Sequence, residues 1–183
     1  MKQTSSFLWE LSKVFIIALV IVIPIRYFLF QPFIVKGDSM VPNFHSGDYL
    51  IIDEISYRFS EPKRGEVIVF KYPENPSQKF IKRIIGVPGE TVEVKDGQVL
   101  LYDKDNNPQV LEETYLPSSN ETYGNLKVSL GDDQYFVLGD NRPYSSDSRT
   151  WGTLPRENII GRVLIRVFPL ASLGKITLPA YAY

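Results

Sequence analysis

The sequence predicts a mainly β protein built from antiparallel sheets and preceded by one membrane-spanning helix at the amino terminus. An unbroken apolar run, Val14 to Ile25, lies close to the start of the chain. After Gln31, short runs of β-branched and aromatic residues alternate with Gly, Pro, Asn and Asp, and no long apolar repeat of helical period appears. The 183 residues suit one domain of ordinary size with a short appendage.

The apolar run predicts a membrane anchor, although its 12 residues are fewer than the ~20 that a spanning helix needs. The span must therefore extend over Arg26, and we expect it to cover roughly Leu8 to Phe30, with Arg26 reaching toward an interface. A cleaved signal peptide is the alternative, but bulky residues follow the run where a cleavage site requires small ones. We expect an uncleaved anchor in residues 1–30 and a catalytic domain in residues 31–183. Basic residues stand on both sides of the run, so charge alone leaves the orientation open.

The domain after the anchor is expected to form its core from short strands. One excursion from the main sheet is expected at about residues 95–133, because Asp103 to Gly131 is polar and rich in turn residues. The dipeptide Asp96-Gly97 predicts a two-residue hairpin turn. The predicted strands are Phe33 to Lys36, Tyr49 to Asp53, Glu66 to Lys71, Lys79 to Val87, Thr91 to Lys95, Val99 to Tyr102, Gln134 to Leu138 and Ile160 to Phe168.

The composition excludes several classes of function. Lys and Arg number 20 against 21 Asp and Glu, so no basic excess points to nucleic acid. Cysteine is absent, which excludes disulfides and thiolate chemistry. The single histidine, His45, lies in a turn-like segment and is expected to be an exposed loop residue, so neither a histidine triad nor a histidine metal site is expected. Asp103 to Pro108 has Pro where a calcium loop requires Gly. We expect no metal and no cofactor.

A lysine can replace histidine as the base for a serine nucleophile if the lysine is neutral. With an ordinary pKa of ~10.4, neutrality at pH 7 costs about 4.6 kcal/mol, and burial can remove most of that cost. Lys82 shares one face of its predicted strand with Phe80 and Ile84, which supplies apolar neighbours. A strand lysine that reaches solvent fits the same pattern equally well. Ser39 lies in a turn after a strand, where an ordinary turn serine is the alternative.

Four segments, in order, resemble the type I signal peptidases, membrane-bound serine proteases that remove signal peptides from exported proteins. Gly37 to Pro42 is similar to the nucleophile box of that family, and Arg64 to Pro73 to its next strand. Lys82 to Glu90 resembles the box that carries the base. Gly139 to Gly152, which taken alone fits a capped surface loop, resembles the last box. Together with the anchor, the resemblance covers about residues 8 to 170.

The resemblance implies a signal-peptidase-like β-domain in which Ser39 is the nucleophile and Lys82 the general base, in a Ser-Lys variant of triad chemistry. It implies that Ser145 hydrogen-bonds and orients the Lys82 amine. It further implies that Asp140 pairs with Arg83, and that Asp147 and Arg149 support the loop. Substrate side chains would enter shallow pockets that accept small residues at positions −1 and −3, lined by Phe33, Val35, Met40, Phe44, Val69, Phe80 and Ile81.

The resemblance also implies the setting of the reaction. Preprotein signal peptides would be the substrates, cleaved through an acyl-enzyme after small-x-small sites, and the lipid bilayer would be a partner. The catalytic domain would lie on the outer face of the bacterial cytoplasmic membrane, held by one span, and we expect it to act as a monomer. Some relatives place a hydroxyl donor for the oxyanion two residues before the nucleophile, where this chain has Gly37. Asn43-Phe44 and Pro143-Tyr144 also depart from the usual residues.

Two other readings are weighed against this expectation. A self-cleaving repressor-type peptidase shares the Ser-Lys chemistry but carries an amino-terminal DNA-binding domain, where this chain has an apolar run. A catalytically silent domain that binds extended peptides at a sheet edge would have no need of both Ser39 and Lys82. Ala180-Tyr181-Ala182 matches a small-x-small site, which raises the hypothesis of self-processing; a chance match in an apolar tail is the alternative.

Overall fold

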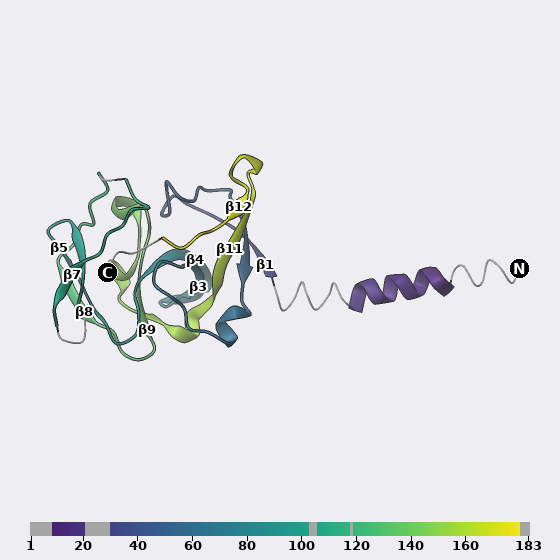
Figure 1. Cartoon of the computed structure of the whole chain (residues 1–183), viewed down its shortest axis with the longest axis horizontal. Helices are drawn as coiled ribbons and strands as arrows, with labels where there is room; N and C mark the ends of the chain where they lie inside the picture. Colours follow the sequence, from purple (N-terminus) through teal and green to yellow (C-terminus); the bar gives the residue numbers. More distant parts are fainter. Residues whose placement is uncertain (1–8, 21–29, 103–105, 118, 180–183) are drawn as a thin grey trace, which may run out of the picture.

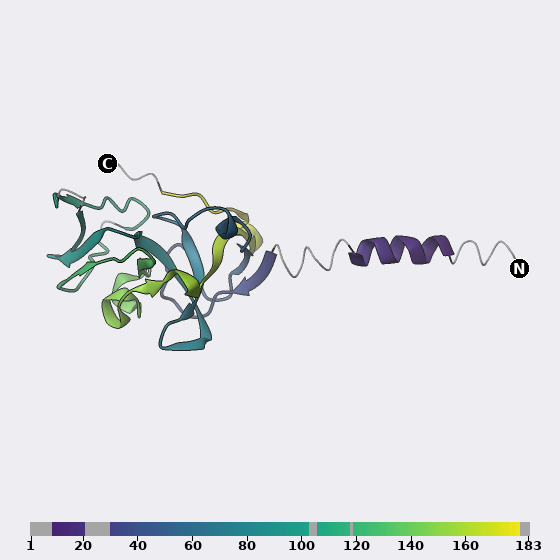
Figure 2. The same ribbon diagram turned by 90° about the horizontal axis from the view of Figure 1, so that it is seen from below.

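The computed structural model describes residues 9–20, 30–102, 106–117 and 119–179 (Figures 1 and 2). Residues 9–20 are helical. In the part of the chain that is described, no helix has both the length and the apolar character needed to cross a bilayer. The predicted anchor, about Leu8 to Phe30, lies partly outside the described residues, at positions 8 and 21–29.

The main sheet positions the residues expected to act in catalysis. Its strand order is β1-β2-β11-β3-β4-β9-β10, with β12 paired to β11, and every neighbouring pair is antiparallel. The strands are β1 (Phe30–Ile34), β2 (Tyr49–Asp53), β3 (Val67–Tyr72), β4 (Asn75–Gly86), β9 (Gln134–Leu138), β10 (Leu154–Pro155), β11 (Ile159–Phe168) and β12 (Gly174–Lys175). The mainly β, antiparallel fold that the sequence predicts is therefore confirmed.

A second sheet, with order β7-β6-β5-β8, packs beside the main one (Figure 1). It contains β5 (Thr91–Lys95), β6 (Gln98–Tyr102), β7 (Pro108–Val110) and β8 (Leu126–Ser129). The predicted excursion at about residues 95–133 thus belongs largely to a sheet of its own. The sequence analysis missed β7 and β8, because β7 is short and wholly exposed and β8 has only two half-buried apolar residues.

Short helices complete the domain: η1 (Ser56–Arg58), η2 (Arg142–Tyr144), α2 (Ser148–Trp151), η3 (Arg156–Asn158) and η4 (Leu170–Ser172). The hairpin between β5 and β6 turns at Asp96 and Gly97, whose φ angles are 52° and 79°. Two consecutive positive φ values are what a type I′ turn requires, so the predicted hairpin is confirmed.

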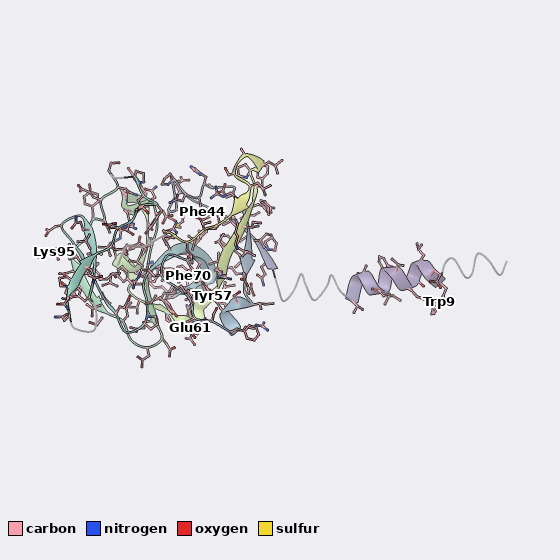
Figure 3. All side chains as sticks on the ribbon, viewed as in Figure 1. Trp9, Phe44, Tyr57, Glu61, Phe70 and Lys95 are labelled. Carbon is pink, nitrogen blue, oxygen red and sulfur yellow. The ribbon has the colours of Figure 1, made fainter. Side chains whose placement is uncertain are left out.

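The core consists of three apolar clusters that meet around β4. Ile81 belongs to a cluster that contains Met40, Phe44 and residues of β2, β3 and β11. Ile85 belongs to a second cluster, which the main sheet shares with the second sheet. Ile84, with Phe80 packed against it, belongs to a third cluster that contains Phe70 (Figure 3). The alternation predicted for β4 is therefore confirmed: Phe80 and Ile84 share one face, and Ile81 and Ile85 the other.

Candidate active site

Lys82 and Ser39 are in direct contact. Lys82 lies in β4 with 4% of its surface exposed, and its Nζ is 2.7 Å from Ser39 Oγ. Nζ also donates to the carbonyl of Ile81 at 3.0 Å and lies 5.4 Å from the centre of the Phe80 ring. The strand lysine is therefore buried rather than extended to solvent, and it faces the serine that the resemblance implies as the nucleophile.

Burial lowers the pKa of Lys82 to about 8, while the negative charges of Asp147 and Asp140 oppose part of that effect. Relative to the ordinary value of 10.5, the cost of the neutral amine at pH 7 falls from about 5 to about 1.4 kcal/mol. A neutral amine can accept a proton from a hydroxyl group. Desolvation by the apolar surroundings therefore supplies most of the change that a lysine base requires.

Ser39 lies in a loop that is fixed by Asn141. The Asn141 backbone N–H donates to the Ser39 carbonyl at 3.0 Å, and the Asn141 side chain donates to the Asp38 carbonyl at 2.9 Å. Gly37, which opens the loop, has a φ of 82°, a conformation that favours glycine. The loop after β1 and the loop after β9 are thus joined at the nucleophile.

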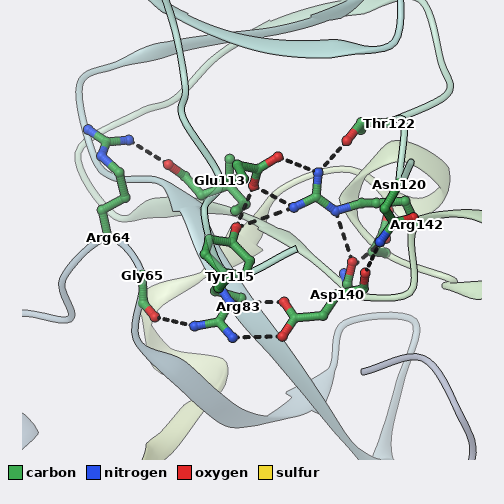
Figure 4. Close-up of polar contacts among 12 residues, drawn as sticks. Arg64, Gly65, Arg83, Glu113, Tyr115, Asn120, Thr122, Asp140 and Arg142 are labelled. Atoms are coloured by element: carbon green, nitrogen blue, oxygen red, sulfur yellow. Dashed lines mark hydrogen bonds and ion pairs between the residues drawn. The ribbon is translucent and has the colours of Figure 1, made fainter. Parts of the chain in front are cut away.

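Arg83 and Asp140 form the buried ion pair that the resemblance implies (Figure 4). Arg83 Nε and NH2 donate to the two oxygens of Asp140 at 2.9 and 2.6 Å, and NH1 donates to the Gly65 carbonyl at 2.9 Å. Asn43, one of the positions where the sequence departs from the family pattern, donates to the same carboxylate at 2.9 Å. The arginine fork satisfies both oxygens of a carboxylate that is fully buried.

Asp147 and Arg149 support the last loop from inside it. Asp147 is fully buried and caps α2, and its two oxygens accept from Arg149 Nε and NH2 at 2.8 Å each. Asp147 also accepts from the Gly139 N–H at 3.1 Å. Arg149 in turn donates to the carbonyls of Tyr123 and Arg142. Asp147 and Arg149, which the resemblance implies as supports of this loop, therefore pair with each other within it.

Ser145 lies at the site but does not make the expected contact. Its hydroxyl is buried and has no hydrogen-bond partner among the described residues, so the predicted hydrogen bond to Lys82 is absent. The Ser145 Oγ lies against Gly139, where an added Cβ would be only 2.2 Å from it. The Lys82 amine instead directs its contacts to Ser39 and the Ile81 carbonyl.

The predicted substrate-binding residues fall into a buried core cluster and the lining of a groove, and two of them, Phe33 and Ile81, belong to both. Val35, Met40, Phe44, Val69 and Ile81 are buried together in one core cluster, each at most 4% exposed, with Phe33 packed against them. Phe33, Phe80 and Ile81 line a groove with a volume of about 430 Å³. Sequence alternation cannot separate these groups, because a core face and the wall of an apolar groove have the same composition.

A group of polar residues that the sequence analysis did not identify surrounds the last loop. Arg142 is almost fully buried, and its guanidinium pairs with both oxygens of Glu113 and donates to Thr122 and the Gly139 carbonyl (Figure 4). Burial alone would lower the pKa of Arg142, but the hydrogen bonds and charge of Glu113 outweigh it and raise that pKa. The sequence did not predict the burial of Arg142 and Glu113, because both lie among other polar residues.

His45 is exposed, as the sequence predicts. Within the described ranges, no group of three or more His, Asp or Glu residues is arranged to bind a metal ion.

Most of the chain, including Ser39 and Lys82, is similar to known proteins. Residues 8–168 match the family described as signal peptidase, peptidase S26. A signal peptidase I of Leptolyngbya laminosa is 42% identical over 185 residues, covering 97% of this chain and 88% of the relative. Signal peptidase I T of Bacillus subtilis is 35% identical over 178 residues, covering 92% and 89%. A solved signal peptidase I from Enterococcus faecalis is 31% identical, covers 56% of this chain and 97% of that chain, and has a TM-score of 0.47.

Proposed function

Because the chain belongs to the signal peptidase family, peptidase S26, we propose that it is a membrane-bound serine endopeptidase that removes signal peptides from exported preproteins. Ser39 is the nucleophile and Lys82 the general base. The observation that carries the proposal is the 2.7 Å contact between Ser39 Oγ and the amine of a buried lysine with a lowered pKa. Nucleophile and base within hydrogen-bond reach are the geometric requirement of this chemistry.

The reaction proceeds through an acyl-enzyme. Neutral Lys82 takes the proton of the Ser39 hydroxyl as its oxygen attacks the scissile carbonyl, and the protonated amine then returns that proton to the leaving amino group. The same amine then takes a proton from water, which attacks the ester carbonyl. The bond to Ser39 Oγ breaks, the new carboxyl group is released, and Lys82 returns the proton to Ser39. The Ser39 backbone N–H, which has no acceptor among the described residues, can donate to the oxyanion. Gly37 has no side-chain hydroxyl, so the Ser39 N–H is the one hydrogen-bond donor to the oxyanion that this loop provides.

The proton transfers require a fixed amine. Lys82 Nζ lies within hydrogen-bond distance of both Ser39 Oγ and the Ile81 carbonyl. In the neutral amine that the mechanism requires, one N–H bond donates to the Ile81 carbonyl and the lone pair accepts from the Ser39 hydroxyl. The buried and unpartnered hydroxyl of Ser145 is the remaining acceptor at the site. We include Ser145 in the proposal as the group that orients the amine once substrate is bound. Asp140, Arg83, Asp147 and Arg149 hold the surrounding loops.

The substrate binds as an extended strand in the groove beside β4. In the described part of the chain, β9 pairs with β4 only from Arg83 to Gly86, so the first half of β4 has one free edge. The groove along this edge is lined by Phe33 and Ile34 of β1 and by Gln78 to Ile81 of β4. An extended peptide can add its backbone hydrogen bonds to this free edge, which leads directly to Lys82. The shallow apolar walls favour small side chains at positions −1 and −3.

The proposal places the enzyme in the bacterial cytoplasmic membrane. The apolar run from Val14 to Ile25 supports one anchor at residues 1–30, and the catalytic domain, residues 31–183, then works on the outer face. The bilayer brings the enzyme and its membrane-inserted substrates together. The chain acts as a monomer, without metal or cofactor.

The test is the position of cleavage in a preprotein with an Ala-x-Ala site. The full chain, solubilised in detergent, is incubated with this preprotein and with a matched variant carrying Phe at position −1, and the products are identified by mass spectrometry. We expect one cut after the second Ala and none in the variant. Cleavage elsewhere, or equal cleavage of both substrates, would contradict the proposed specificity.

A further inference from the structure

A carboxylate that follows the second sheet's strand β7 pairs with a buried arginine in the loop after β9. Glu113 follows β7, and both of its oxygens accept from the guanidinium of Arg142, while Tyr115 donates its hydroxyl to the same carboxylate. The Arg142 side chain is fully buried and that of Glu113 is 12% exposed. Glu113 is therefore the principal counter-charge of a cation that water cannot reach.

Arg142 also contacts the backbone next to Ser39 and Ser145. Its Nε donates to the Gly139 carbonyl at 3.0 Å. Gly139 is tightly enclosed, since a Cβ built on it would be 2.2 Å from Ser145 Oγ and 2.4 Å from the Ser39 carbonyl oxygen. A small displacement of Gly139 must therefore displace Ser39 or Ser145 as well.

Further contacts join the same segment to the loop. Asn120 donates to the Asp140 carbonyl at 2.7 Å, and Asn43 donates to the Tyr115 carbonyl at 3.1 Å. The Arg83 guanidinium lies 4.0 Å from the centre of the Tyr115 ring. Glu113, Tyr115 and Asn120 thus contact both the loop after β9 and the arginine next to Lys82 (Figure 4).

We propose that Glu113 is a positioning residue for the Ser39–Lys82 reaction, acting through Arg142 and Gly139. The inference rests on the proposed function for its catalytic consequence. Without the Glu113 carboxylate, the buried Arg142 cation is left with the charge of Asp140, a carboxylate that already pairs with Arg83. The loop that carries Gly139 would then shift, and with it the alignment of the serine.

The experiment compares Glu113→Gln and Glu113→Ala with Glu112→Gln and Glu112→Ala in the full chain. Glu112 is the exposed neighbour, so each pair removes the same charge one residue apart. We expect both Glu113 variants to lower kcat at least about tenfold with KM changed less than about twofold, since alignment rather than substrate binding is lost. Formate, at constant ionic strength, should restore part of the kcat of Glu113→Ala, because it can occupy the vacated carboxylate position. The Glu112 variants should match the wild type.

Amide hydrogen exchange tests the positioning independently of any proteolytic activity. In Glu113→Ala, exchange should accelerate at residues 139–147 and remain unchanged in β2 and β11, whereas Glu112→Ala should change neither. Equal exchange at residues 139–147 in the two variants would overturn the inference, even if the chain cleaves preproteins as proposed. Unaltered kcat in Glu113→Ala, or a loss that formate does not restore, would also count against it. If the wild type does not cleave the preprotein, the proposed function is wrong. Amide hydrogen exchange at residues 139–147 then still tests whether Glu113 positions the loop.

Discussion

In the proposed mechanism, Lys82 sets the pH dependence of cleavage, because only its neutral form can accept the Ser39 proton. Burial lowers the pKa of Lys82 to about 8. The neutral fraction is then about 0.1 at pH 7, about 0.5 at pH 8 and about 0.9 at pH 9. A solvent-exposed lysine of pKa 10.5 would give about 0.003 at pH 8, so the burial is worth more than a hundredfold in active enzyme.

The assay is kcat/KM for a preprotein without groups that titrate near its cleavage site, measured from about pH 6 to about pH 10. We predict a rise of about tenfold between pH 7 and pH 9 with a midpoint near 8. Because kcat/KM reports the free enzyme, the midpoint reports Lys82 before substrate is bound. A midpoint near 10.5 would mean that Lys82 is not desolvated. A midpoint near 6.5, or a flat profile, would assign the base to another group.

Two further substitutions probe the same region. Lys82→Met should stabilise the fold at pH 7 by about 1 to 3 kcal/mol, because the pKa of Lys82 in the folded state lies below its value in the unfolded chain. The buried charged amine therefore destabilises the fold fully below about pH 8, and this penalty is lost as the pH rises from about 8 to 10.5. Urea unfolding at pH 7 and pH 10 checks this, and an equal difference at both would contradict it. Gly139→Ala should abolish cleavage and destabilise the fold by about 1 to 3 kcal/mol, because its Cβ would overlap the Ser39 carbonyl and Ser145. Gly131→Ala, whose Cβ would lie 3.5 Å from a flexible Gln134 side chain, is the matched control for rates and thermal unfolding, and similar losses in both would refute the steric argument.

Strands that are short β-branched or aromatic runs bounded by turn residues could be predicted from the sequence. Tyr49–Asp53, Thr91–Lys95 and Gln134–Leu138 have the bounds expected for them, since each ends at turn residues. The strand β4 begins four residues earlier than expected, at Asn75, because the polar residues 75–79 are held by pairing with β3 and not by burial. Edge pairing of this kind depends on a partner strand and leaves no apolar pattern.

The proposed catalytic pair, Ser39 and Lys82, could be predicted only through the resemblance, because the local pattern fits a solvent-exposed lysine and an ordinary turn serine equally well. The resemblance also implied the Arg83–Asp140 pair, but not the pair that Arg142 forms with Glu113. Arg142 and Glu113 are 29 positions apart, and each lies among other polar residues, so nothing local distinguishes them from a solvated loop. Their burial follows from the packing of the second sheet against the last loop, which only the folded chain brings together.

The central claim is that Ser39 and Lys82 act as nucleophile and base, and the most direct test is cleavage of an Ala-x-Ala preprotein by the wild type, Ser39→Ala and Lys82→Ala. Each variant is first shown to be folded by its thermal unfolding transition. The account predicts that the wild type cleaves and that both folded variants are inactive at every pH tested. Cleavage by either variant at a rate near that of the wild type would contradict the Ser-Lys mechanism.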